Sequence, residues 1–108
     1  MKKTITIAIS LSVVLFFIIA SCQKKNKTPA LYTPTCNGIK SFKTDVLPLI
    51  QSKCVSCHNE YSNYSQISSA ASSIRSAIVN RSMPKGGSLT DGQKDVIVCW
   101  IDAGVTNN

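Results

Sequence analysis

The hydrophobic positions of this chain fall into two parts with different patterns. Residues 4–20 form one apolar stretch with 13 apolar residues in 17 positions, and Lys2 and Lys3 precede it. A positively charged start followed by an apolar stretch too short to span a membrane comfortably is typical of a secretory signal peptide. We therefore assign residues 1–21 to a signal peptide and expect the protein to be exported.

Further along the chain, apolar residues recur at helical spacing. Residues 45–50 are predicted to be helical, and Pro48 must start or kink this helix because proline lacks a backbone N–H. A serine-rich helix is predicted over residues 64–79, where four apolar residues share one face and can close one side of a pocket. These residues are Ile67, Ala71, Ile74 and Ile78.

The last predicted helix has the clearest boundaries. Thr90 and Gln93 form a capping box, and Gly104 is a C-terminal stop. Its apolar residues are Val96, Trp100 and Ala103 on one face, with Ile97 and Ile101 beside them. We find no strand pattern, so the predicted fold class is all-α with three or more helices.

Between the signal peptide and the helices lies a polar segment, residues 22–35. It contains Lys24, Lys25, Lys27 and two prolines without apolar periodicity, which predicts a flexible tether. Its lysines serve either to contact anionic lipid headgroups or simply to keep the segment soluble. Residues 36–108 then form a single small domain, because 33 of the 87 residues after position 21 are apolar, enough for one modest core.

Charge excludes one class of function. The formal net charge of the chain is +7, but five lysines lie before residue 36, which leaves +2 for residues 36–108. This domain has two arginines and little clustering of positive charge. A nucleic-acid-binding face normally concentrates basic residues, so we expect no nucleic-acid partner.

The end of the signal peptide contains a recognisable motif. Ile19-Ala20-Ser21-Cys22 resembles the lipobox of bacterial lipoproteins. The resemblance implies cleavage before Cys22 and lipidation of its thiol, which would anchor the protein to a membrane facing the periplasm or cell exterior. The alternative is an uncleaved anchor. Gln23 is not acidic, which favours the outer membrane, and export permits structural disulfides.

The strongest chemical motif is Cys54-Val55-Ser56-Cys57-His58, the C-x-x-C-H pattern of covalent c-type haem attachment. The two thiols would form thioethers with the haem vinyl groups, and His58 would ligate the iron. A zinc site that takes a fourth ligand from Cys36 or Cys99 is an alternative, although such sites normally use two separated ligand pairs. A thioredoxin-like redox pair is another, but no βαβ pattern surrounds the motif.

Elimination indicates the second axial ligand of the iron. His58 is the only histidine, and Met83 is the only methionine left once the signal peptide is removed. Met83 lies in a stretch with Pro84, Gly86 and Gly87, which predicts a loop able to carry the thioether to the iron. The alternative is a methionine that merely fills the core.

Cys36 and Cys99 are the two cysteines that have no role in lipidation or haem attachment. They lie next to the first predicted helix and within the last one, and these helices must meet if both cover the same haem. We therefore expect a disulfide between them, with two independent buried thiols as the alternative.

Taken in order, these motifs resemble a class I c-type cytochrome. The resemblance rests on the apolar helix, the C-x-x-C-H motif, the Met83-Pro84 loop and the ending Trp100-Ile101-Asp102-Ala103-Gly104, and it covers residues 42–104. It implies a monohaem all-α cytochrome c fold, thioethers at Cys54 and Cys57, axial ligation by His58 and Met83, and electron transfer. The Cys36 and Cys99 pair and the serine-rich middle segment do not belong to the general pattern.

A haem with both axial positions filled leaves no open site for a substrate, so we expect a one-electron shuttle between redox partner proteins and no enzyme. The alternative is a gas-binding haem sensor in which Met83 dissociates. Three lysines at the haem edge would either steer the domain toward an acidic partner or form an ordinary solvated surface. They are Lys53, Lys85 and Lys43.

Overall fold

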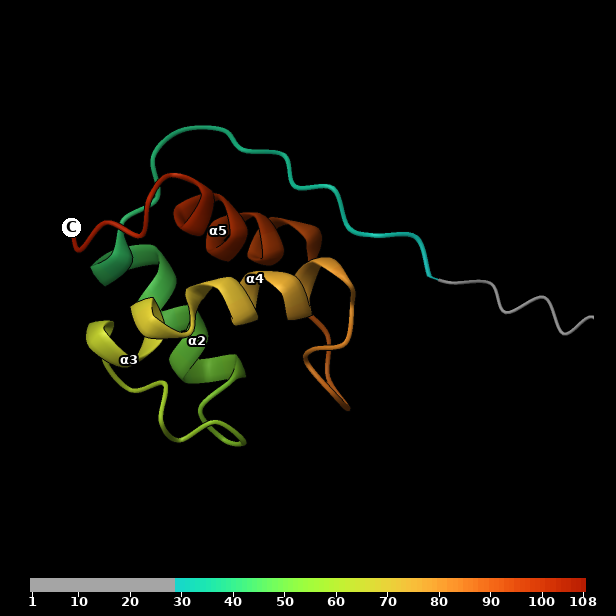
Figure 1. Ribbon diagram of the computed structural model, residues 1–108, viewed down its shortest axis with the longest axis horizontal. Helices are drawn as coiled ribbons and strands as arrows, with labels where there is room; N and C mark the ends of the chain where they lie inside the picture. The colour runs from blue at the N-terminus through green and yellow to red at the C-terminus, as the bar shows by residue number, and fades with distance from the viewer. Residues whose placement is uncertain (1–28) are drawn as a thin grey trace, which may run out of the picture.

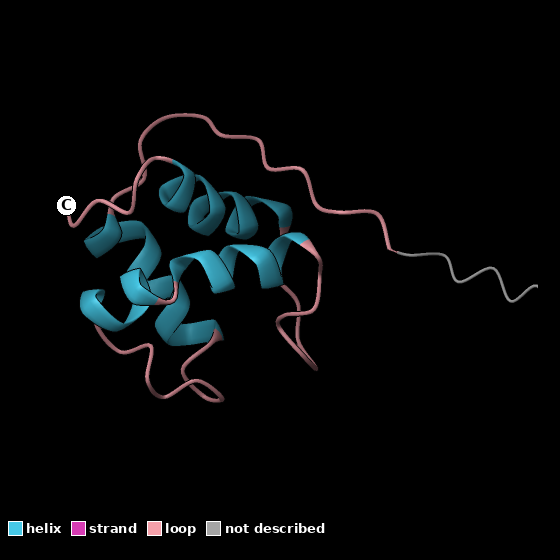
Figure 2. Cartoon of the chain, viewed as in Figure 1, coloured by secondary structure: helices cyan, strands magenta, loops and turns pink. Residues whose placement is uncertain are grey.

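The computed structural model describes residues 29–108. The expected signal peptide, Cys22 and the first part of the tether lie outside the described residues. Within residues 29–108 every regular element is helical and none is a strand (Figure 2), which confirms the all-α prediction. The elements, labelled in Figure 1, are the π-helical turn η2 (Phe42–Val46), α2 (Leu47–Lys53), α3 (Tyr64–Ser69), α4 (Ala71–Val79) and α5 (Asp91–Asp102). Across these elements no helix has the length and apolar character that crossing a membrane requires.

The first helical segment begins at a polar cap and continues past the proline. Ser41 Oγ accepts a hydrogen bond from the Thr44 N–H, and the Asp45 carboxylate accepts one from the Ser41 N–H at 2.8 Å. These two bonds start η2, which runs directly into α2. Pro48 lies in the first turn of α2, as predicted, because proline is compatible with that turn but not with the interior of a helix. The helical run of η2 and α2 begins at Phe42 and ends at Lys53, three residues beyond each end of the predicted helix over residues 45–50.

The serine-rich segment forms two helices, so the prediction of one helix over residues 64–79 is wrong. The break lies at Ala70, whose ψ is 0°. The Ser69 hydroxyl donates to the Ser65 carbonyl at 2.7 Å, and the Ser68 hydroxyl donates to the same oxygen. Such side-chain bonds compete with the helical ladder and bend helices. The predicted apolar face is nevertheless buried in full: Ile67, Ala71, Ile74 and Ile78.

The ends of α5 agree with those predicted from the sequence. The capping box is present, with the Gln93 N–H donating to Thr90 Oγ1 and the Thr90 N–H donating to Gln93 Oε1. At the other end Gly104 has a φ of 105°, and its N–H bonds to the Ile101 carbonyl. The Val105 N–H bonds to the Trp100 carbonyl, which completes a Schellman motif.

The buried face of α5 differs in part from the predicted one. Ile97 and Trp100 are fully buried as expected. Ala103 is exposed, because the helix ends at Asp102 and the chain turns away there. Val98, which was not assigned to a face, is fully buried.

An aromatic cluster joins the ends of the domain. The Phe42 ring lies 5.3 Å from the Trp100 ring and 5.1 Å from the Tyr64 ring, measured between centroids. The C-terminal residues close over this cluster: Trp100 Nε1 donates to the Thr106 carbonyl, and the Phe42 N–H donates to Asn108 Oδ1. Truncating Phe42 or Trp100 to alanine is therefore expected to cost about 3–5 kcal/mol.

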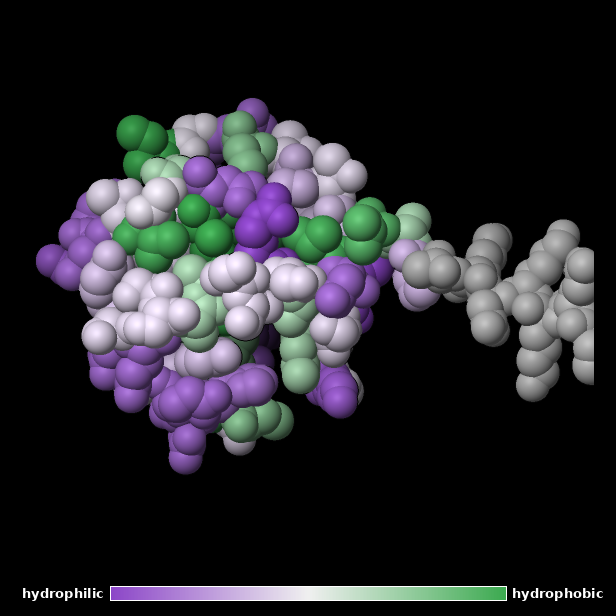
Figure 3. Space-filling view, viewed as in Figure 1, coloured by the Kyte–Doolittle hydropathy of each residue, from purple (hydrophilic) through white to green (hydrophobic). Residues whose placement is uncertain are grey.

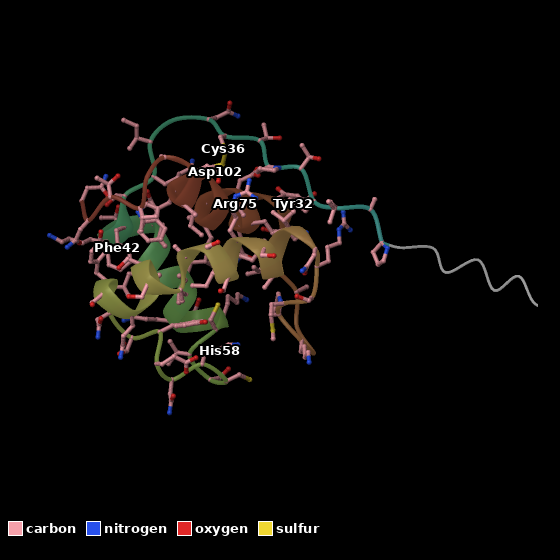
Figure 4. All side chains as sticks on the ribbon, viewed as in Figure 1. Tyr32, Cys36, Phe42, His58, Arg75 and Asp102 are labelled. Carbon is pink, nitrogen blue, oxygen red and sulfur yellow. A yellow bond between two sulfur atoms is a disulfide. The ribbon has the colours of Figure 1, made fainter. Side chains whose placement is uncertain are left out.

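Residues 32–36, which we call the strap, are held against α4 and α5. Tyr32 is 8% exposed, its N–H donates to the Val79 carbonyl, and its hydroxyl lies 2.7 Å from Asp95 Oδ1. Figure 4 shows Tyr32 and Cys36 beside α5. Tyr32 and Thr35, which belong to the end of the predicted tether, are held on the domain, because Tyr32 is buried and the N–H groups of both residues are hydrogen-bonded. The predicted disulfide between Cys36 and Cys99 is confirmed, with Cα atoms 5.4 Å apart.

Candidate functional site

A cavity of about 620 Å³ lies between two loops, one following α2 and the other following α4. Figure 1 shows both loops below α4, on the side away from α5. Cofactors and small ligands normally occupy cavities of about 300–1,000 Å³, so this cavity is large enough for one. Hydrophilic residues cover much of the face seen in Figure 3, whereas most of the surface inside the cavity is apolar.

The floor of the cavity is part of the hydrophobic core. It is made of Ile50 from α2, Ile74 and Ile78 from α4, and Leu89 from the segment before α5, each at most 9% exposed. Two of these residues, Ile74 and Ile78, belong to the apolar face that the sequence predicted as a pocket wall. A planar apolar group would therefore find contacts on both α2 and α4.

The loop after α2 brings the C-x-x-C-H residues to one rim. Cys54 is the C-cap of α2, and its N–H donates to the Ile50 carbonyl at 2.8 Å. The Cys54 carbonyl then accepts bonds from the N–H groups of Cys57 and His58, at 3.1 and 2.8 Å. This tight turn places Cys54, Cys57 and His58 together in the cavity lining.

The two thiols of this rim are not bonded to each other. Cys54 is half-buried and Cys57 is exposed, and burial raises the pKa of the Cys54 thiol. A redox-active C-x-x-C pair instead relies on a lowered pKa that yields a nucleophilic thiolate. The described residues also contain no strand, so the thioredoxin-like alternative does not fit.

The zinc alternative does not fit either. Cys36 and Cys99 are joined to each other, so neither offers a thiolate as the fourth ligand. Over residues 29–108 no three His, Cys, Asp or Glu side chains come together in a way that could hold a metal ion.

The His58 ring is held on two sides. Its Nδ1 lies 3.2 Å from Glu60 Oε1, and its face stacks on Tyr61 with ring centroids 5.0 Å apart. A backbone hydrogen bond of Glu60 and the contact with His58 lower the pKa of the Glu60 carboxyl. A glutamate carboxyl is in any case ionised at neutral pH. An ionised carboxylate only accepts hydrogen bonds, so Nδ1 carries the hydrogen here. In the neutral ring Nε2 then holds the lone pair that a metal requires.

The loop after α4 brings Met83 to the opposite rim. The N–H groups of Ser82 and Met83 both donate to the Ala77 carbonyl, at 3.0 and 3.2 Å. Gly86 has a φ of 68°, which allows the chain to turn back, and the buried Leu89 ends the loop. Met83 is half-buried and lines the same cavity as His58, although 25 positions separate them in the sequence.

Two of the three lysines assigned to the haem edge lie at this cavity. Lys53 and Lys85 line it and are exposed. Lys43 belongs to η2, where its N–H donates to the main-chain oxygen of Asn108, and it is not among the lining residues. Lys43 therefore lies away from the cavity lining, because η2 packs near the C-terminal residues.

Sequence reasoning missed Glu60 and Tyr61 as parts of the site. The second ring nitrogen of a metal-ligating histidine commonly bonds a main-chain carbonyl or a carboxylate, and the structure places the Glu60 carboxylate beside His58 Nδ1. The signal was present in the sequence, since an acidic and an aromatic residue follow His58 by two and three positions.

Comparisons of the chain with protein-family models, with curated proteins and with solved structures find no match in any of the three. The interpretation of the site therefore depends on its own residues.

Proposed function

We propose that this protein is an electron-transfer protein with one covalently bound c-type haem. One observation carries the proposal: the four residues that the sequence selects for haem attachment and ligation all line one apolar cavity of about 620 Å³. Cys54, Cys57 and His58 form one rim and Met83 belongs to the other. The class I cytochrome c fold is part of this proposal.

The residues of the cavity fit a haem in their chemistry. Two unpaired thiols are available for thioethers, an imidazole offers Nε2, and a thioether sulfur lies in the same lining. When bound, haem supplies an iron that changes oxidation state by one electron. His58 and Met83 would hold its two axial positions, Cys54 and Cys57 its edge, and Ile74 and Ile78 would exclude water from one face.

An electron shuttle follows from this ligand set. If His58 and Met83 both ligated the iron, no position would be left open for a substrate, so we propose no enzymatic activity. A thioether ligand favours the reduced iron and raises the reduction potential relative to two imidazoles. The partners would be redox proteins that approach the exposed rim near Lys53 and Lys85. Export and a lipid anchor at Cys22, with the outer membrane favoured, remain part of the proposal.

The test is the visible spectrum of the purified protein in both oxidation states. We expect haem that survives denaturation and solvent extraction with the chain, and a weak sulfur-to-iron band near the red end of the ferric spectrum. Met83→Leu keeps the size of the side chain but removes the sulfur, so it should abolish this band and lower the potential. Lys85→Ala is the control, because it alters the same loop and retains the sulfur.

Two results would contradict the proposal. A purified protein without covalent haem would exclude it. Rapid binding of carbon monoxide by the reduced wild-type protein would favour the gas-sensing alternative, because it would show that Met83 leaves the iron readily.

A further inference from the structure

The carboxylate beside His58 has a defined position. Glu60 Oε1 lies 3.2 Å from His58 Nδ1, and the Tyr61 N–H donates to the His58 carbonyl at 2.9 Å. That backbone bond closes the turn of residues 58–61, which keeps the carboxylate at the edge of the ring that faces away from Nε2. Tyr61 stacks on the ring face with an interplanar angle of 14°, so rotation of the imidazole is limited as well.

We propose that Glu60 is a positioning residue that holds the imidazole of His58 in its Nδ1–H form and lowers the reduction potential of the iron bound at Nε2. This inference rests on the proposed function. A metal-bound histidine that donates its second N–H to a carboxylate becomes a stronger electron donor, and such outer contacts change metal affinity or activity by about 10–100-fold. Stronger donation stabilises the ferric iron more than the ferrous iron.

This effect opposes that of Met83 and acts from the other side of the cavity. The thioether favours reduced iron, whereas the hydrogen-bonded imidazole favours oxidised iron. The reduction potential of the iron would therefore depend on both loops. One loop would act through the ligand Met83, and the other through Glu60, the hydrogen-bond partner of the ligand His58.

A bare negative charge would also lower the potential, so the experiment must separate charge from hydrogen bonding. The Glu60 side chain is 53% exposed, and solvent screens its charge. Glu60→Gln removes the charge and leaves a weaker neutral acceptor, and Glu60→Ala removes the acceptor altogether. Asp91→Asn is the matched control: its carboxylate is 79% exposed, pairs with Lys94 at 2.9 Å and is not among the cavity residues.

The first measurement is the midpoint potential by spectroelectrochemistry. We expect Glu60→Gln to raise the ratio of ferrous to ferric protein at a fixed applied potential about tenfold, which is ~59 mV for a one-electron couple. Glu60→Ala should raise it further. Asp91→Asn should change it much less.

The second measurement reads the hydrogen bond itself. Because the chain has one histidine, ¹⁵N-histidine labelling gives an unambiguous Nδ1–H signal in the reduced holoprotein. We expect this proton far downfield in the wild type, clearly upfield of that position in Glu60→Gln, and in fast exchange with water in Glu60→Ala.

If both Glu60 variants keep the wild-type proton shift and move the potential no more than Asp91→Asn does, while the haem stays covalently bound, the inference about Glu60 is wrong and the proposed function stands. If the purified protein has no covalent haem, the proposed function itself fails.

Discussion

The strap side and the cavity side of this domain are stabilised in different ways. On the strap side, Tyr32 is buried under α5 with hydrogen bonds to the Asp91 carbonyl and Asp95, and a disulfide joins Cys36 to Cys99. Lys94 Nζ lies 4.7 Å from the centroid of the Tyr32 ring. On the cavity side, two loops meet around an apolar space, and the thiols of Cys54 and Cys57 are unpaired.

The difference separates the part of the domain that is closed by its own residues from the part that contains the cavity. On the strap side, the hydroxyl and the N–H of Tyr32 have hydrogen-bond partners within the chain, and the Tyr32 ring is buried. The cavity side presents apolar floor residues, thiols, an imidazole and a thioether to one space. Under the proposed function, the strap side would serve as a scaffold, and the cavity side would be the site that a haem completes.

The largest expected effect comes from breaking the cavity side. Cys54→Ser combined with Cys57→Ser should give a colourless and largely unfolded chain, because a domain of this size has little core to spare without its cofactor. Haem staining of a denaturing gel and circular dichroism are the measurements, with Ser56→Ala as the control inside the same motif. Residual amide protection should be concentrated in α5 and the strap. A variant that retains covalent haem would refute the attachment sites.

A smaller loss of stability is expected when the disulfide of the strap side is removed. Cys36→Ser combined with Cys99→Ser removes a bridge between residues 63 positions apart. Chain entropy assigns such a bridge about 4 kcal/mol, and a covalent haem that already restricts the unfolded chain should reduce the loss to about 2–3 kcal/mol. Denaturant unfolding of the holoprotein measures this change. The ferric spectrum and potential should stay unchanged, since neither cysteine lines the cavity; a shifted potential would show that the two sides are coupled.

The smallest effect concerns one hydroxyl of the strap. Burial, followed by the hydrogen bond to Asp95 and its charge, raises the pKa of Tyr32 to about 12. Tyrosine in the unfolded chain ionises near pH 10, so the stability that this hydroxyl contributes is complete below pH 10 and is lost as the pH rises toward 12. Tyr32→Phe should therefore destabilise the protein by about 1–2 kcal/mol at neutral pH. The difference in the free energy of unfolding between Tyr32→Phe and the wild type should become smaller between pH 10 and 12.

Denaturant unfolding at neutral and alkaline pH tests this prediction. Tyr64→Phe is the control at neutral pH, since it also loses a hydroxyl hydrogen bond, to the Val105 carbonyl, outside the strap. A deficit of Tyr32→Phe that stays constant from pH 7 to 12 would show that the hydroxyl is not held as a protonated donor.

The local features of this protein could be predicted from its sequence alone. Thr90 with Gln93 and Gly104 predicted the ends of α5, because capping involves residues three or four positions apart. The spacing of apolar residues predicted which face of α3 and α4 is buried. The spacing of Cys54, Cys57 and His58 predicted a shared rim, since a single turn holds all three.

The contacts between distant segments could not be predicted from the sequence, because they depend on how the helices pack. Tyr32 lies in a polar, proline-bearing segment and is buried because α4 and α5 offer it a carbonyl, a carboxylate and apolar contacts, 63 positions away in the case of Asp95. Met83 reaches the cavity of His58 because the Ala77 carbonyl holds the start of its loop and Leu89 enters the core. Glu60 lies near His58 in the sequence, yet its contact depends on how the turn of residues 58–61 closes. Local spacing selects helices and caps, whereas long-range contacts depend on which surfaces the packed helices leave available.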